Sequence, residues 1–364
     1  MNEHRDRGRV FDGIRGGALR ALVLAGALAL AGAAGLGAAT AAPVAFSAPT
    51  AADPVIAAAG DIACDPADPD FNGGSGTPSR CRQQATAALL DGADAVLPLG
   101  DNQYEDGTFS AYQQSYGPSM SWGFYNAVAH PVAGNHEYNT PEAADYYAYF
   151  GAAAGDPVEG FYSFDLGSWH LVALNSSRSL GPGAQLGWLH ADLAATTKPC
   201  ILAYWHKPRF TSGSHPNDLD VDPFWRALYQ FRADVVLNGH NHHYERFDLQ
   251  DPDGFYDPQG IREFVVGTGG KSRSSFVTIQ PNSQVRESNT YGVLKLTLHA
   301  NSYEWRFVPE AGETFHDPPI TEPPGTTACH AGPTVVKPAA CRAGFWAAGR
   351  KGRLRYVCLG RWKP

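Results

Sequence analysis

Val55-Ile56-Ala57-Ala58-Ala59-Gly60-Asp61 is a short apolar run that ends in a glycine and a carboxylate. An uninterrupted apolar run of this length is typical of a strand that is buried on both faces of a sheet. Later segments repeat the arrangement of a polar block after an apolar run: Gly100-Asp101-Asn102-Gln103-Tyr104, Gly134-Asn135-His136-Glu137, Trp205-His206 and Gly239-His240-Asn241-His242. Each polar block is therefore expected where a strand ends.

The segments around these blocks alternate between strand and helix patterns. Helices are predicted over 83–90, 141–150, 185–193 and 222–231, and buried strands over 95–99, 201–205 and 234–237. A hairpin is predicted between 161 and 174, and an antiparallel pair over 291–298 and 303–308. Strands that alternate with helices favour an α/β core.

Side chains that follow the strands of such a core are expected to converge. The loops at the carboxyl edge of the sheet open on one side, so residues far apart in sequence meet in one crevice. The residues concerned are Asp61, Asp101, Asn135, His206, His240 and His242. Taken singly, each is better explained as a polar turn residue, or for His206 as a hydrogen-bonded histidine at a strand end. Their joint occurrence in this order favours a pair of hydrolytic metal ions.

The order of the blocks resembles the calcineurin-like metallophosphoesterases over residues 54–329. Most members of that superfamily have a histidine two residues after the first aspartate, where this chain has Ala63. The chain has instead Tyr104, three residues after Asp101, as in the Gly-Asp-x-x-Tyr block of the purple acid phosphatases. Within the superfamily the chain is therefore most similar to the purple acid phosphatases.

This resemblance implies a fold and a metal centre. The fold is a four-layer αββα sandwich of two mixed sheets flanked by helices. The implied ligands of one metal are Asp61, Asp101, Tyr104 and His242, and those of the other are Asp101 as a bridge, Asn135, His206 and His240. Because a phenolate and carboxylates suit a hard cation, the favoured pair is Fe(III) with a divalent ion of zinc, manganese or iron.

The implied reaction is attack of a metal-bound hydroxide on the phosphorus of a phosphomonoester. His136 follows the ligand Asn135 and is the first candidate to contact the phosphate or protonate the leaving group. His215 is a second candidate for that role. A phosphodiesterase or nucleotidase on the same metal core is the enzymatic alternative, and a non-catalytic surface-binding protein is the alternative outside enzymes.

The amino-terminal segment predicts export. Arginines between positions 5 and 20 precede an Ala/Leu/Gly run over 21–39 and small residues at 39–41, which is the order of a cleaved secretory signal. An uncleaved membrane anchor is the alternative, because the run is long enough to span a bilayer; the small residues favour cleavage and no stable anchor. The predicted parts are a signal peptide at 1–41, a linker at 42–53, a catalytic domain at 54–330 and a basic extension at 331–364, in a secreted or cell-envelope protein.

Charge and cysteine content bear on partners and compartment. A formal net charge of -8 argues against a dedicated nucleic-acid binder. The resemblance implies a small phosphoester as the partner. The basic extension has two interpretations, a weak contact with a polyanion and a solvated hairpin, of which the second is favoured. Export permits disulfides: Cys64 with Cys81 and Cys341 with Cys358 are the preferred pairs, and Cys200 is either a free thiol or the partner of Cys329.

Two further sets of residues have less specific interpretations. The segment Gly269-Gly270-Lys271-Ser272 ends like a phosphate-binding loop, but Val265 stands where that motif needs its first glycine. Phosphate binding and surface ion pairs explain three basic residues near the predicted ligands equally well: Lys207, Arg209 and Arg246.

Overall fold

The computed structural model describes residues 52–117, 121–178, 184–330, 344–348 and 354–358. The predicted signal peptide lies outside the described ranges. Among the described helices, none combines the length and apolar character that crossing a bilayer requires.

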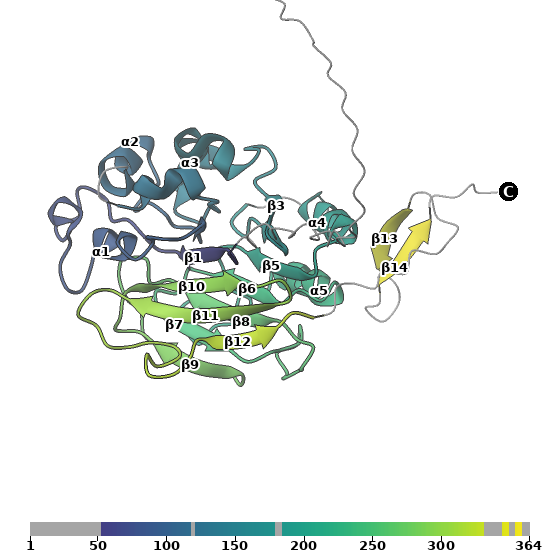
Figure 1. The fold of residues 1–364 in the computed structure, drawn as a ribbon. Helices are drawn as coiled ribbons and strands as arrows, with labels where there is room; N and C mark the ends of the chain where they lie inside the picture. The colour runs from purple at the N-terminus through teal and green to yellow at the C-terminus, as the bar shows by residue number, and fades with distance from the viewer. Residues whose placement is uncertain (1–51, 118–120, 179–183, 331–343, 349–353, 359–364) are drawn as a thin grey trace, which may run out of the picture. The chain divides into compact units, whose positions relative to one another are not determined.

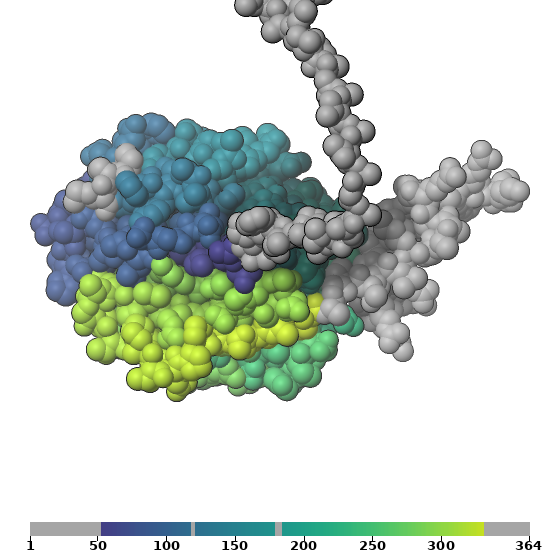
Figure 2. Space-filling view, viewed as in Figure 1, coloured from purple at the N-terminus to yellow at the C-terminus, as the bar shows by residue number. Residues whose placement is uncertain are grey.

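The first of two mixed sheets has the strand order β12-β11-β10-β1-β2 (Figure 1). Its strands are β1 (Val55–Ala59), β2 (Ala95–Pro98), β10 (Gly292–Leu298), β11 (Ser302–Pro309) and β12 (Gly325–Ala328). The β1–β2 pair is parallel and the other pairs are antiparallel. On the surface, the purple start of the described chain lies between the blue segments and the yellow-green strands (Figure 2), as expected for a strand paired with both β2 and β10.

The second sheet has the order β3-β4-β5-β6-β8-β7-β9. Its strands are β3 (Tyr162–Leu166), β4 (Trp169–Ala173), β5 (Cys200–Tyr204), β6 (Val235–Asn238), β7 (Tyr244–Phe247), β8 (Arg262–Val266) and β9 (Ser283–Glu287). The central strands from β4 to β8 are parallel, and the pairs at both edges are antiparallel. A separate hairpin consists of β13 (Gly344–Ala348) and β14 (Leu354–Cys358).

The helices lie on both sides of the sheets. They are α1 (Gln83–Ala87), α2 (Phe109–Ala111), α3 (Ala144–Phe150), α4 (Ala184–Ala195) and α5 (Asp222–Gln230), with short helices of other types over 72–74, 112–116, 122–128, 137–139, 141–143 and 151–154. α1 to α3 lie together beside the first sheet, and α4 and α5 lie beside the second (Figure 1).

Residue alternation in β5 explains the layering. Leu202 and Tyr204 belong to the core shared by both sheets, whereas Ile201 and Ala203 belong to a second core with residues of α4 and α5. Successive side chains of a strand point to opposite faces, and each face of β5 packs against an apolar core. The residues of β5 are therefore apolar without interruption. The predicted αββα sandwich of two mixed sheets is confirmed.

Local predictions held best for strands. The predicted helix at 83–90 is shorter, since α1 ends at Ala87. The predicted helix at 141–150 was wrong in its first turn, because Glu142 and Ala143 have φ of 54° and the α-helix begins only at Ala144. A positive φ is not compatible with a right-handed helix.

Two disulfides join segments of the body. Cys64–Cys81 is present as predicted. The open question for Cys200 is answered by a bridge to Cys329, 129 residues away, with a Cα–Cα distance of 5.5 Å. The predicted Cys341–Cys358 pair cannot be compared with the structure, because Cys341 lies outside the described residues. The predicted boundaries at 53 and 330 stay predictions.

Candidate metal centre

The polar blocks meet at the carboxyl ends of four strands that belong to both sheets. Asp61 follows β1, Asp101 follows β2, His206 follows β5 and His240 follows β6. Asp61, Asp101 and His240 adopt the left-handed backbone region, with φ of 60°, 48° and 69°. These turns bend the chain at the strand ends, so that the side chains point into the space where the two sheets meet.

Glycines beside the ligands permit the close approach of the loops. A Cβ atom on Gly134 would lie 2.2 Å from Asp101 Oδ1, and one on Gly100 would lie 2.7 Å from His206 Nδ1. Both distances are far shorter than a van der Waals contact. Gly134 therefore leaves space for the side chain of Asp101, and Gly100 leaves space for the side chain of His206.

One group of predicted ligands surrounds the phenol of Tyr104. Its oxygen lies 2.8 Å from Asp61 Oδ1, 3.1 Å from Asp101 Oδ2 and 3.1 Å from His242 Nε2. A phenol has one proton to donate, but three acceptor-type atoms face it. Carboxylates, a phenol and an imidazole converging on one point fit a hard metal cation in their midst.

A second group shares Asp101 with the first. His206 Nε2 lies 3.2 Å from Asp101 Oδ2 and 3.2 Å from His240 Nδ1. Asn135 Oδ1 is buried without a hydrogen-bond partner among the described residues. An unpartnered buried carboxamide oxygen is costly unless something absent from the protein binds it. The residues of both groups thus fit a binuclear centre bridged by Asp101.

Other contacts orient the predicted ligands. His206 Nδ1 donates to Leu99 O at 2.9 Å, which leaves Nε2 as the atom that faces the site. His242 Nδ1 lies 2.7 Å from Ser272 Oγ. Asp61 Oδ2 accepts from the backbone of His240 at 2.8 Å. Imidazoles held by one nitrogen present the other in a fixed direction.

The charges of the site favour a cation. Burial raises the pKa of Asp101, but His206 outweighs this effect and the net pKa is lowered. Burial lowers the pKa of His206, yet Asp101 raises it to about 9. Burial, Asp101 and Asp61 raise the pKa of Tyr104 well above 10. The carboxylates are therefore ionised, whereas Tyr104 needs a bound cation to become a phenolate.

Glu137 is a functional residue that the sequence interpretation missed. Its buried carboxylate accepts hydrogen bonds from Asp101 N (2.9 Å), Asn102 N (2.8 Å), Gln103 N (3.2 Å), Gly134 N (2.6 Å) and the Tyr112 hydroxyl (2.9 Å). It thus joins the loop after β2 to the loop that carries Asn135. The sequence signal was its place inside the Gly-Asn-His-Glu block, but nothing in the sequence shows that it is buried.

The two predicted catalytic histidines lie at different sides of the site. His136 Nε2 is 3.9 Å from Asp101 Oδ2, and its Nδ1 lies 2.5 Å from Glu105 O. The exposed His215 has its ring centroid 4.4 Å from that of His240. Each imidazole therefore borders one of the two ligand groups.

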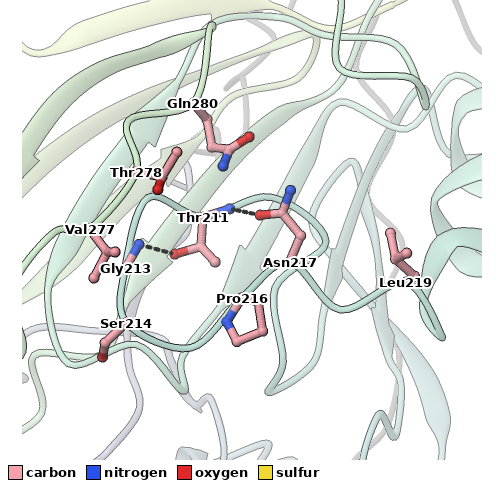
Figure 3. Close-up of a pocket in the computed structure, with 9 residues that line it drawn as sticks. All are labelled: Thr211, Gly213, Ser214, Pro216, Asn217, Leu219, Val277, Thr278 and Gln280. Carbon is pink, nitrogen blue, oxygen red and sulfur yellow. Dashed lines mark hydrogen bonds between the residues drawn. The ribbon is translucent and has the colours of Figure 1, made fainter.

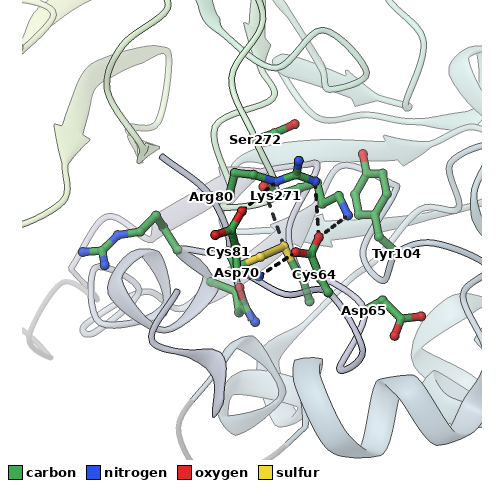
Figure 4. Close-up of a disulfide and its surroundings, with 12 residues drawn as sticks. Cys64, Asp65, Asp70, Arg80, Cys81, Tyr104, Lys271 and Ser272 are labelled. Carbon is green, nitrogen blue, oxygen red and sulfur yellow. Dashed lines mark hydrogen bonds and ion pairs between the residues drawn. A yellow bond between two sulfur atoms is a disulfide. The ribbon is translucent and has the colours of Figure 1, made fainter. Parts of the chain in front are cut away.

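The side chain of Lys271 extends toward the Tyr104 ring (Figure 4). Its buried ammonium is 4.9 Å from the ring centroid and forms ion pairs with Asp68, at 3.4 Å, and Glu105. The Lys271 carbonyl accepts from Cys81 N at 3.2 Å, which ties it to the Cys64–Cys81 disulfide. The segment 269–272, set aside as a phosphate loop, therefore contacts the predicted ligands Tyr104 and His242 instead.

Two of the basic residues considered for phosphate binding are engaged in ion pairs. Arg209 pairs with Asp222 at 3.0 Å, and Arg246 pairs with Asp317 at 2.6 Å. Both guanidinium groups pair with carboxylates outside the set of predicted ligands. Of the two interpretations of Arg209 and Arg246, phosphate binding and ion pairing, the structure therefore agrees with ion pairing.

A family model for calcineurin-like phosphoesterases matches residues 55–244. The chain belongs to this family. Its curated relatives include purple acid phosphatase 23 of Arabidopsis thaliana, which is 30% identical over an alignment of 154 residues and is matched with coverages of 38% of this chain and 33% of the relative. Purple acid phosphatase 15 of the same plant is 31% identical over an alignment of 159 residues, with coverages of 38% of this chain and 29% of the relative. The match thus spans about a third of the length of these relatives.

Solved structures show the same fold. The purple acid phosphatase PPD1 from yellow lupin (Lupinus luteus) seeds has a TM-score of 0.60 at 16% identity, over 76% of this chain and 53% of that chain. GAP50, the anchor in the inner membrane complex of Plasmodium, has a TM-score of 0.53 at 13% identity, over 78% of this chain and 90% of that chain. The resemblance to purple acid phosphatases is confirmed, and the family to which the chain belongs is of a binuclear metal enzyme type.

Proposed function

We propose that this chain is an exported phosphatase that hydrolyses phosphomonoesters at two metal ions. The observation that carries the proposal is the sharing of Asp101 Oδ2 by two ligand groups, one around Tyr104 and the other around His206 and His240. A shared carboxylate oxygen is what a bridge between two neighbouring cations requires.

The proposed ligands of the first ion are Asp61, Asp101, Tyr104 and His242, and those of the second are Asp101, Asn135, His206 and His240. Tyr104 supports Fe(III) in the first position, because a phenolate needs a strongly acidic ion. A divalent ion of zinc, manganese or iron suits the second set, which has more imidazole. When bound, such ions supply a water of lowered pKa and neutralise charge on the phosphoryl oxygens.

The chain's own residues then orient and protonate the substrate. His136 Nδ1 donates to the carbonyl of Glu105, so the ring is held with Nε2 toward Asp101 and the site. In its imidazolium form Nε2 is placed to donate a proton to the leaving alkoxide. His215 borders the other ligand group and is the second candidate for that proton transfer.

Export is supported by the two disulfides of the body, which are typical of oxidising compartments. Amino-terminal sequencing of the mature protein tests it. We expect the mature chain to begin near residue 42, and a mature chain that still begins at Met1 would contradict cleavage.

Activity is tested with p-nitrophenyl phosphate and its bis ester, on protein whose metal content is measured. We expect faster hydrolysis of the monoester, and a loss of about a hundredfold or more in kcat for Asp101→Asn, because the bridge between the ions is removed. Asp91→Asn, an exposed carboxylate elsewhere, is the matched control and keeps full activity. Preference for the bis ester would favour the phosphodiesterase alternative. A protein that binds two ions and hydrolyses neither ester would favour the non-catalytic alternative.

A further inference from the structure

A cavity of about 420 Å³ lies between two loops of the second sheet (Figure 3). Its lining residues are Thr211, Gly213, Ser214, Pro216, Asn217, Leu219, Val277, Thr278 and Gln280. The volume is in the range of pockets that bind small molecules. The proposed mechanism has so far assigned no role to this cavity.

The cavity is next to the proposed metal centre. Its lining residues Ser214 and Pro216 flank His215, whose ring lies 4.4 Å from that of His240. The His215 backbone is attached to Asn241 by two hydrogen bonds, His215 N to Oδ1 at 3.0 Å and Nδ2 to His215 O at 3.1 Å. Asn241 stands between the proposed ligands His240 and His242. His215 therefore connects the loop that lines the cavity to the segment that carries His240 and His242.

Buried hydrogen bonds hold the two walls of the cavity in place. Ser212 O accepts from Val277 N at 2.8 Å, and Ser212 Oγ accepts from Gln280 N at 2.9 Å. The buried Glu245 in turn accepts from Ser212 N at 2.8 Å and from Ser212 Oγ at 2.5 Å. Both walls are thus attached to one serine and one carboxylate, and the cavity exists before a ligand enters.

The lining combines free hydrogen-bonding groups with apolar surface. Among the described residues, the Ser214 and Thr278 hydroxyls and the Gln280 carboxamide have no hydrogen-bond partner. Leu219 and Val277 are 67% and 70% exposed. These groups suit a ligand that has hydroxyls and carbon surface together.

The described residues that line the cavity include no Asp, Glu, Lys, Arg or His. The arginines on the neighbouring segments are engaged elsewhere, Arg209 with Asp222 and Arg273 with the carbonyl of Asn289. A leaving group with further phosphates would find no cationic partner among these residues.

We infer that this cavity binds the leaving group of the substrate, and that this group is uncharged and hydroxylated, as in phosphate monoesters of sugars and polyols. The inference rests on the proposed phosphatase activity and names the class of ester on which it acts. Thr278 and Gln280 determine specificity because their side chains donate hydrogen bonds to the hydroxyls of the leaving group or accept hydrogen bonds from them.

The test compares kcat/KM for glucose 6-phosphate, ADP and p-nitrophenyl phosphate in the full-length metal-loaded protein. We expect the wild type to favour glucose 6-phosphate over ADP by about tenfold or more. Thr278→Val and Gln280→Leu are each expected to lower the ratio of glucose 6-phosphate to p-nitrophenyl phosphate activity about fivefold, because the nitrophenyl group has no hydroxyl apart from the ester oxygen and so does not depend on the lost hydrogen bond. Thr326→Val, an exposed threonine of β12, should leave the ratio unchanged.

Three results would overturn the inference. Preference of the wild type for ADP would show that the leaving-group site accepts charge. An unchanged ratio in both cavity variants would show that the cavity does not contact the leaving group. These two results leave the phosphatase proposal standing, whereas a wild type that hydrolyses none of the three esters would overturn both proposals together.

Discussion

Glu137→Gln tests whether the metal loops depend on one buried carboxylate. The wild-type oxygens accept five hydrogen bonds, two at Oε2 and three at Oε1. A glutamine can place its amide on either side, but the amide is a donor and faces at least two donors in both orientations. At least two hydrogen bonds are lost whichever way the side chain turns.

The expected loss follows from this count. A hydrogen bond to a charged acceptor contributes about 1.5–3 kcal/mol, so two of them amount to about 3–6 kcal/mol. Burial and Asp101 raise the pKa of Glu137, which means that the ionised carboxyl costs free energy in this site and that its neutral replacement recovers part of the loss. We therefore expect the free energy of unfolding to fall by about 3 kcal/mol at pH 7.

Urea unfolding followed by circular dichroism measures this change, and metal analysis of the same variant measures its effect on the site. We expect fewer than two ions per chain, because Asp101 and Asn135 lose their common anchor. Glu313→Gln, at an exposed position, is the control for the chemical change itself. A free energy of unfolding within about 1 kcal/mol of wild type, together with full metal content, would refute the proposed anchoring role.

Three other changes test separate parts of the structure. Tyr104→Phe should abolish the visible absorption band of iron-loaded protein, because that band arises from the phenolate; a band that persists would mean that Tyr104 is not a ligand. Burial lowers the pKa of His170, but hydrogen bonds to Asp192 and Asp165 raise it by more, so the net pKa is raised. His170→Asn should therefore destabilise by about 1.5 kcal/mol at pH 5.5 and by less at pH 8.5, because this stabilisation is lost as the pH rises through the raised pKa. A loss that is equal at both pH values would contradict this charge dependence. Replacing Cys200 and Cys329 together by serine should lower the free energy of unfolding by about 4 kcal/mol, since the disulfide closes a long loop, and an unchanged midpoint in urea would contradict it.

The buried strands β1, β2, β5 and β6 could be predicted because they depend on local patterns, whereas β7, β9 and β12 were not predicted. The run Val55–Ala59 is apolar at every position, and the structure places it in the middle of a sheet with both neighbours paired. The helix expected from 141 was less predictable. Its first residues take positive φ values that no local propensity indicates.

The candidate site divides in the same way. Asp61, Asp101 and His206 are recognisable because each follows an apolar run, and the topology of a sheet brings such positions together. Glu137 and Lys271 have no comparable signal. A buried carboxylate with five donors and an ammonium beside Tyr104 exist only because loops from separate strands pack on one another.

By itself the sequence determined the fold class, the family and the types of side chain at the end of each strand, since these follow from hydrophobic periodicity and from short blocks of fixed residues. Only the tertiary structure decided the partner of Cys200, the anchoring role of Glu137 and the cavity beside His215. The physical reason is that these features are contacts between residues distant in sequence. Their energies depend on distances and burial, which no local pattern encodes.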